Sequence, residues 1–118
     1  MVHLSTANSF FSVGQVYLNL REYPKALEHH LKALQIYRDI NGERHPETPE
    51  SFYHVAEVYR RLGDFLKAIK YNLKARDLYK FLSQVLASDD FEGKLAQVNR
   101  SLKECQKGIE CNIKTYDT

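Results

Sequence analysis

A shift of 42 residues aligns Thr6-Ala-Asn-Ser-Phe-Phe-Ser-Val-Gly-Gln-Val-Tyr17 with Thr48-Pro-Glu-Ser-Phe-Tyr-His-Val-Ala-Glu-Val-Tyr59. The same shift aligns Tyr23-Pro-Lys-Ala-Leu-Glu-His-His-Leu-Lys-Ala33 with Phe65-Leu-Lys-Ala-Ile-Lys-Tyr-Asn-Leu-Lys-Ala75. Across residues 6 to 39, the 34 aligned positions contain 13 identical pairs without a gap, beginning at Thr6, Ser9, Phe10, Val13, Val16, Tyr17, Leu20, Lys25, Ala26, Leu31, Lys32, Ala33 and Tyr37. The chain therefore contains an internal duplication, and a period of this length indicates a repeat architecture.

Apolar residues in both copies follow the i, i+3, i+4, i+7 spacing of one helical stripe. The first helix of each copy carries Phe10, Val13, Gly14, Tyr17 and Leu20, or Phe52, Val55, Ala56, Tyr59 and Leu62. The second helices carry Ala26, Leu27, Leu31, Ala33, Leu34 and Ile36, or Phe65, Ala68, Ile69, Leu73, Ala75 and Leu78. We therefore predict an all-α fold of five antiparallel helices over residues 6–21, 24–41, 48–62, 65–86 and 89–113.

Residues at the predicted helix ends support this division. Thr48 is a suitable N-cap, and Pro49 fits the first helical position because that N–H has no intrahelical partner. Gly63 can end its helix in a left-handed conformation, and Asp64 can cap the next helix. Asn41 and Gly42 stop the second helix of the first copy.

The chain has the length of one domain, spanning residues 1–118. We divide it into a first repeat (6–47), a second repeat (48–87) and a last helix (88–114), capped by Ser88 or Asp89. Leu95, Val98 and Leu102 continue the pattern of the second copy's first helix at a spacing of 43. This helix is either a capping helix or part of a third repeat, since terminal repeats must cover an apolar end.

These residues resemble the tetratricopeptide repeat pattern of a large apolar residue, a Leu-Gly-like pair, Tyr, Ala, a bulky residue and Ala. The matching residues are Phe10, Val13-Gly14, Tyr17, Ala26, His30 and Ala33, then Phe52, Val55-Ala56, Tyr59, Ala68, Asn72 and Ala75. The 42-residue period and the link from Gly42 to Pro46 are similar to the kinesin-light-chain subclass, and the Leu-Gly-Asn repeat of G-protein scaffolds is a close relative. The resemblance implies a right-handed α-solenoid. The Asn-Asn pair common in that subclass is replaced by Phe11-Ser12 and Tyr53-His54, so its cargo preferences do not transfer.

In this family, one face of each first helix lines a concave groove. By register, the resemblance assigns to that groove Asn8, Phe11, Ser12 and Gln15 in the first copy, and Glu50, Tyr53, His54, Glu57 and Arg60 in the second. Phe11 and Tyr53 are the expected anchors, because aromatic residues dominate binding hot spots. The alternative is that both aromatics pack on the neighbouring second helices. The surface has no Lys–Asn pair, so binding of an acidic chaperone C-terminus through a carboxylate clamp is disfavoured.

Charge and hydropathy argue against other partners. The 17 basic and 15 acidic residues are interleaved and give a net charge of +2, without the basic cluster that nucleic-acid binding needs. No stretch approaches the roughly 20 apolar residues of a membrane span, and the N-terminus does not resemble a signal peptide. Cys105 and Cys111 point about 120° apart on one helix, so we expect two free thiols and a cytoplasmic location.

No motif predicts catalysis, a cofactor or a metal. The sequence has no phosphate-binding loop, nucleophile elbow, HExxH motif or EF-hand loop. His29 and His30 point about 100° apart on a helix and cannot chelate from one face without a third ligand. We expect one of them to be partly packed and the other solvated.

The expected function is therefore protein binding, with the groove presented to a peptide or a helix of another protein. The alternative is a self-association module. Two repeats fall short of the three usually needed for stability, so a second copy of the chain could close one open end.

Overall fold

The computed structural model describes the backbone of residues 3–42, 45–86 and 91–117, which forms five helices and no strand. They are α1 (Leu4–Asn19), α2 (Tyr23–Asn41), α3 (Glu47–Arg61), α4 (Phe65–Leu86) and α5 (Glu92–Asp117). The predicted all-α repeat fold is confirmed. The bounds of α4 match the prediction, whereas the other helices differ by a few residues at one or both ends.

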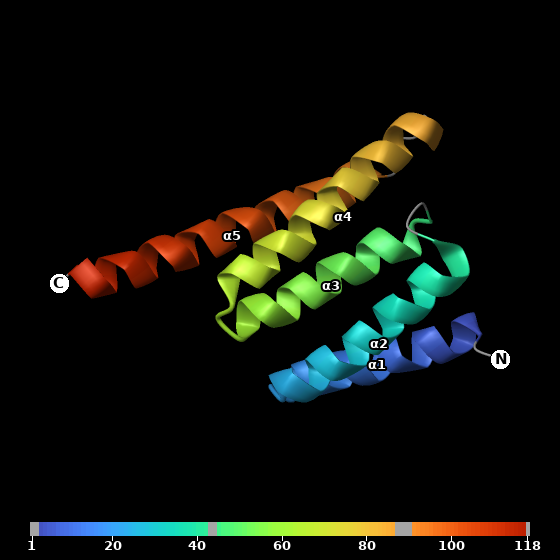
Figure 1. Cartoon of the computed structure of the whole chain (residues 1–118), viewed down its shortest axis with the longest axis horizontal. Coiled ribbons are helices and arrows are strands. Elements are labelled where there is room, and N and C mark those ends of the chain that lie inside the picture. The colour runs from blue at the N-terminus through green and yellow to red at the C-terminus, as the bar shows by residue number, and fades with distance from the viewer. Residues whose placement is uncertain (1–2, 43–44, 87–90, 118) are drawn as a thin grey trace.

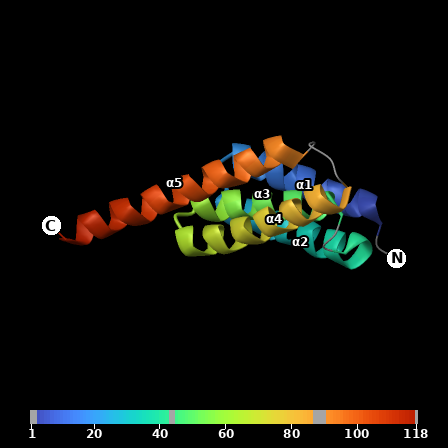
Figure 2. The ribbon, with the colours of Figure 1, turned by 90° about the horizontal axis from the view of Figure 1, so that it is seen from above.

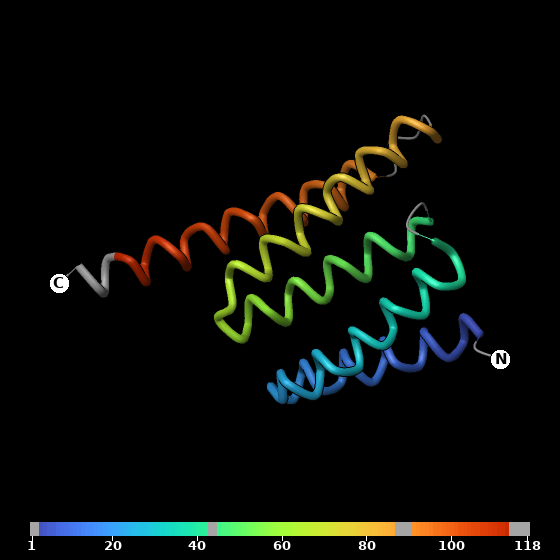
Figure 3. Tube along the Cα trace, viewed as in Figure 1, coloured from blue at the N-terminus to red at the C-terminus, as the bar shows by residue number. Residues whose placement is uncertain are grey.

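The helices form two antiparallel hairpins followed by a single helix. Contacts join α1 to α2, α2 to α3, α3 to α4 and α4 to α5, so each element packs on the next one along the chain (Figure 1). Seen from above, the first helices α1 and α3 lie in one layer with α5, and α2 and α4 lie in the other (Figure 2). The array measures 52 × 33 × 19 Å, and the C-terminal end of α5 extends beyond the turn that joins α3 to α4 (Figure 3).

The two intra-hairpin turns have the same backbone geometry but different residues. Gly63 has φ +82° as predicted, and its N–H donates to the carbonyl of Arg60. The equivalent residue 42 positions earlier is Arg21, which adopts φ 61°. The N–H of Asp64 donates to the carbonyl of Tyr59, and its Oδ1 accepts from the N–H of Lys67 at 3.2 Å, so the predicted cap of α4 is confirmed.

The link between the hairpins corrects one predicted cap. Thr48 is not the N-cap of α3, because that helix begins at Glu47 with Pro46 at its cap position. Thr48 is fully buried, and its Oγ1 donates to the carbonyl oxygen of Gly42 at 2.7 Å. Gly42 ends α2, as predicted, and it has φ +70°. The Thr48 hydroxyl thus joins the end of α2 to the start of α3. The described residues do not include residues 43–44 or 87–90, and the proposed caps Ser88 and Asp89 fall in the second of these gaps.

Small residues bring the helices of each hairpin together. Ala26, Ala33, Ala68 and Ala75 are fully buried. The main core cluster contains Leu34, Phe52, Val55, Ala75, Tyr79, Leu82, Phe91 and Val98, which come from α2 to α5 and the residue before α5. A smaller cluster of Ala7, Ala33 and Tyr37 joins α1 to α2.

The predicted stripe of α1 is wrong at Val13 and Leu20. Their exposed fractions are 41% and 64%, although the equivalent Val55 is fully buried. In α1, the buried residues are Ala7 and Gly14. Most of the stripe of α3 is covered by α2, although Leu62 at its end is 41% exposed. No helix precedes α1 among the described residues to cover its own stripe.

Candidate functional site: the face formed by the first helices

The residues predicted to bind a partner lie on α1 and α3, on the surface that we call the first-helix face. It is defined by Asn8, Phe11, Ser12, Gln15, Glu50, Tyr53, His54, Glu57 and Arg60. Two pockets open on this face, and each contains one of the two predicted aromatic anchors.

The first pocket has a volume of about 190 Å³ and lies where α1, α2 and α3 meet. Its walls are Asn8, Phe11, Tyr37, Glu47, Glu50 and Ser51. The Tyr37 hydroxyl donates a hydrogen bond to Asn8 Oδ1. Burial raises the pKa of Tyr37, and the negative charges of Glu47 and Glu50 raise it further. Ser51 is only 1% exposed, and its Oγ has no hydrogen-bond partner. The pocket therefore combines an aromatic wall, two carboxylates and an unpaired hydroxyl.

Beside this pocket, Phe11 lies against two histidines. Its ring is 5.1 Å from the ring of His30 and 4.7 Å from that of His54, edge-on to both. The two imidazoles are stacked at 5.9 Å. His30 is fully buried with neither ring nitrogen hydrogen-bonded, and burial lowers its pKa to about 4, with smaller contributions from His54 and His29. His30 is therefore neutral and acts as a packing residue.

His54 of α3 and Lys94 of α5 both lie near Glu50, a carboxylate of the first pocket. Its Nε2 lies 3.9 Å from Glu50 Oε1, and Lys94 Nζ lies 3.6 Å from Glu50 Oε2. The interaction with His54 lowers the pKa of Glu50, and together with the charge of Lys94 it outweighs the opposing effect of burial. Glu50 is therefore ionised at neutral pH.

The second pocket, of about 130 Å³, lies between α3 and α5. It is lined by Tyr53, Glu57, Arg60, Gln97, Arg100, Ser101 and Glu104. Arg60 donates to Glu57 Oε2 at 2.7 Å, and Ser101 Oγ donates to Glu57 Oε1 at 2.6 Å. Burial raises the pKa of Glu57, but these two hydrogen bonds and the charge of Arg60 outweigh it, so the net shift is downward. This carboxylate is fixed in its charged form.

The structure brings most of the predicted residues together. Asn8, Phe11 and Glu50 share the first pocket, and Tyr53, Glu57 and Arg60 share the second. His54 lies between them, with its ring 5.3 Å from that of Tyr53. Gln15 is partly buried with an unpaired Oε1, and Ser12 is exposed.

Phe11 and Tyr53, the two predicted anchors, pack on the core, as the alternative to a groove role predicted. Phe11 packs against the Ala7–Ala33–Tyr37 cluster, and Tyr53 packs against the main cluster. Both remain partly accessible. Their side chains therefore form the boundary between core and surface.

Sequence reasoning missed the residues that other elements add to this face. Tyr37 comes from α2, and Ser101, Arg100 and Glu104 come from α5. The 43-residue spacing that aligns Leu95, Val98 and Leu102 with α3 could have placed the α5 residues, because it makes α5 a third first helix. Tyr37 reaches the first pocket because of the way α2 crosses α1, and no sequence pattern predicts that contact.

Two further pockets lie away from the first-helix face. One, of about 380 Å³, is lined by Arg38, Phe52, Lys70, Tyr71, Lys74 and Asp77 of α2, α3 and α4. The other, of about 300 Å³, is lined by Gly63, Asp64, Phe65, Leu66, Ile109, Asn112 and Ile113. In the second of these, Gly108 of α5 allows the Phe65 ring to approach, since a Cβ there would lie 2.4 Å from Phe65 Cζ.

The described residues carry no metal-binding cluster of three or more His, Cys, Asp or Glu side chains. Within the same residues, no helix is long and apolar enough to cross a membrane. His30 is more buried than predicted, and His29 is partly buried rather than solvated, with its ring 5.2 Å from that of Tyr17. Cys105 is buried and Cys111 is exposed, and neither forms a disulfide.

Helical hairpins stacked in two layers with a 42-residue period define a helical-repeat protein of the scaffold type. The tetratricopeptide repeat family model matches residues 4–80, which is more than half of the chain, and the chain belongs to this family. Tetratricopeptide repeats as a family form a non-catalytic scaffold fold and generally mediate protein–protein interaction. No curated protein sequence matches the chain.

Proposed function

We propose that this chain is an adaptor that holds a peptide or a helix of a partner protein on the first-helix face. The observation that carries the proposal is the equivalent placement of Phe11 and Tyr53, 42 residues apart, each in its own pocket. Partly buried aromatic side chains provide contact area at low entropic cost, which is why they serve as anchors. We further propose that the chain belongs to the kinesin-light-chain-like subclass and acts in the cytoplasm.

The first pocket favours a basic side chain of the partner. Phe11 offers an apolar wall for the methylene stem of a lysine or arginine, and Glu47 and Glu50 offer negative charge. The hydroxyl of Ser51 is buried without a partner, so a donor from the ligand would satisfy it. The second pocket already pairs Glu57 with Arg60, and it therefore favours polar groups of either sign.

A pull-down from cell lysate followed by mass spectrometry identifies the partner, and titration of that partner then tests the face. Phe11→Ala and Tyr53→Ala should each weaken binding at least tenfold, because loss of an aromatic anchor costs about 2 kcal/mol or more. Tyr23→Ala removes a partly buried aromatic in the first turn of α2 and serves as the control. Both anchors also pack on the core, so their loss could unfold the chain. Binding is therefore measured at a temperature at which circular dichroism shows every variant to be folded. Equal affinity in all four chains would contradict the proposal.

Self-association is the second candidate, favoured by the exposed apolar residues Val13, Val16 and Leu20 of α1. In this function, two copies would cover each other's open end. Sedimentation velocity over a range of concentrations decides it, with a dimer expected for this function and a monomer contradicting it.

A further inference from the structure

A pocket of about 380 Å³ opens between the second helices α2 and α4, and we call it the second-helix pocket. Its lining residues are Arg38, Phe52, Lys70, Tyr71, Lys74 and Asp77. Seen from above, α2 and α4 lie in the layer opposite to α1, α3 and α5 (Figure 2). All of the lining residues come from α2, α3 and α4. The pocket is therefore a feature of the junction between the two hairpins, on a surface that the first-helix face does not include.

Two aromatic rings form the floor of the second-helix pocket. Phe52 of α3 is 5% exposed, and its ring lies 5.9 Å from that of Tyr71, which is partly buried. The guanidinium carbon of Arg38 lies 5.6 Å from the centre of the Phe52 ring, and the Arg38 side chain is exposed. A ligand in the pocket would therefore meet ring surface below it and a positive charge beside it.

The rim of the pocket carries more positive than negative charge. Lys70 and Lys74 of α4 add two cations to that of Arg38, and all three side chains are exposed. Asp77, the acidic residue of the lining, already has a cationic neighbour, since its Oδ1 lies 3.5 Å from Arg76. The net charge of the whole chain is only +2, so this surplus is local. Such a surplus favours an anionic ligand.

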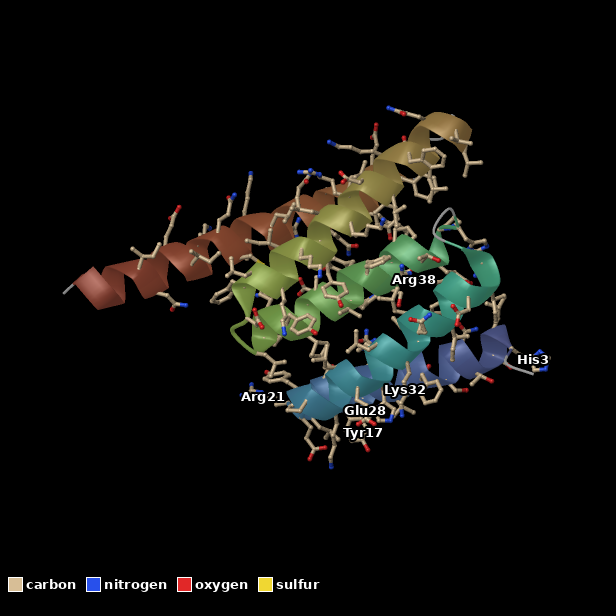
Figure 4. The ribbon with its side chains drawn as sticks, viewed as in Figure 1. His3, Tyr17, Arg21, Glu28, Lys32 and Arg38 are labelled. Carbon is tan, nitrogen blue, oxygen red and sulfur yellow. The ribbon has the colours of Figure 1, made fainter. Side chains whose placement is uncertain are left out.

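The internal duplication shows that the two lysines replace an ion pair. The residues 42 positions before Lys70 and Lys74 are Glu28 and Lys32. In α2, Lys32 Nζ lies 3.3 Å from Glu28 Oε1. Figure 4 shows these two side chains together on α2, with Arg38 further along the helix toward α3. The first copy thus has opposite charges four residues apart, and the second copy has like charges at the same positions.

The lysine pair opposes the stability of its own helix. Like charges at positions i and i+4 destabilise a helix, whereas a glutamate four residues before a lysine stabilises it. Glutamate at position 70 would therefore stabilise α4, as Glu28 stabilises α2. Residues that break a local rule in this way are expected at functional sites. An anion bound between Lys70 and Lys74 would remove the repulsion between them.

We propose that the second-helix pocket binds an extended acidic segment of a partner protein. Lys70 and Lys74 are four residues apart on a helix, which is a rise of about 6 Å. Alternate residues of an extended peptide lie about 6.6 Å apart and point to the same side. Glutamates at positions i and i+2 of the segment match the two lysines, and their methylene groups lie on the rings of the floor.

The floor and the rim favour a peptide over a nucleic acid. Proteins that bind single strands use a long positively charged groove with aromatic rings on which successive bases stack. Here the rim is short and includes Asp77, whose charge would repel a phosphate chain. The rings offer no open platform either, because Phe52 is buried and Tyr71 is already stacked on Tyr59 at 5.4 Å.

A labelled peptide of alternating glutamate and serine, titrated into the full chain at low ionic strength, tests the pocket by fluorescence anisotropy. The principal variant is Lys70→Glu, because it reverses one charge of the pocket and restores the ion pair of the first copy. The matched control is Lys103→Glu on an exposed position of α5 outside the pocket. This control makes the same change of charge and also places a glutamate four residues before a lysine, Lys107. Phe11→Ala separates the pocket from the first-helix face.

We expect Lys70→Glu to weaken peptide binding about tenfold and Lys103→Glu to weaken it less than about twofold, because salt screens a distant charge. The Lys70→Glu variant should melt no lower than the parent, so its loss of affinity cannot come from unfolding. Phe11→Ala should leave the affinity for this peptide unchanged, since this proposal does not rest on the first-helix face and the two can fail separately. Equal weakening by Lys70→Glu and Lys103→Glu, or no binding to the parent, would overturn the proposal. Tighter binding of a single-stranded oligonucleotide of the same charge would also overturn it.

Discussion

Gly14→Ala tests whether His30 is packed as tightly as the structure indicates. A Cβ at position 14 would lie 2.8 Å from His30 Cδ2 and 2.9 Å from His30 Nε2. The imidazole cannot easily move aside, since it is fully buried and lies against the rings of Phe11 and His54. Alanine would therefore force the ring or α1 to shift.

The magnitude follows from two opposing effects. Overpacking a well-filled core costs about 1–3 kcal/mol. Alanine also favours an interior helical position over glycine by about 1 kcal/mol. The net expectation is a destabilisation of about 1 kcal/mol, measured as a lower urea midpoint by circular dichroism. Gly93→Ala in α5 is the control, because a Cβ there meets nothing within 4 Å, and it should be neutral or stabilising.

The second repeat suggests a compensating substitution. The residues equivalent to Gly14 and His30 are Ala56 and Asn72, both fully buried, so a larger first-helix residue is paired with a smaller second-helix residue. Gly14→Ala combined with His30→Asn should be more stable than the sum of the single effects by about 1 kcal/mol or more. Additive effects, or a Gly14→Ala chain more stable than the parent, would refute the packing argument.

Three further predictions concern pH, a turn and the last helix. Burial lowers the pKa of His30 from 6.5 to about 4, so His30 takes up a proton at a higher pH in the unfolded chain than in the folded one. The free energy of unfolding should therefore drop by up to roughly 2–3 kcal/mol as the pH falls from about 6.5 to 4. An equally steep drop in the His30→Asn variant would exclude His30 as the cause. Arg21→Gly should raise the free energy of unfolding by about 0.5–1 kcal/mol, because φ is 61° there, and a lower urea midpoint would count against it. Deleting residues 88–118 should expose Tyr79 and Leu82 and cause aggregation in light scattering, whereas a monomer of unchanged stability would show that α5 is an independent tail.

The first four helices and their order could be predicted from the duplication, and the fifth from the apolar spacing of Leu95, Val98 and Leu102. The 42-residue repeat, the apolar spacing, and the signals at Gly42, Gly63 and Asp64 agree with one another, and such agreement between local and global signals specifies a fold. The helix ends could be predicted less well where a side chain can act either as a cap or as a tertiary hydrogen-bond donor. Thr48 has the side chain of an N-cap but donates its hydroxyl to the preceding helix, and that choice depends on the tertiary contact.

Burial in α1 could not be predicted from residue type. Val13 and Val55 are the same residue in the same register, and their exposure differs because α3 has a preceding helix. The left-handed turn at Arg21 was missed for a related reason, since arginine carries no local signal for positive φ and the hairpin geometry imposes it.

The nine predicted site residues could be placed on one face because helical register fixes direction. Their pairing could not be predicted, since it depends on elements distant in sequence. Glu57 is held by Ser101, which is 44 residues away, and Asn8 is held by Tyr37. The depth to which Phe11 packs on its own core likewise depends on the crossing of α1 and α2.

Binding of a partner protein on the first-helix face can be mapped by nitrogen-15 chemical shifts of the chain titrated with the captured partner. The largest shifts should cluster at Phe11, Tyr53 and His54 on α1 and α3. Shifts clustered instead at Tyr71 and Lys74, around the pocket between α2 and α4, would contradict it.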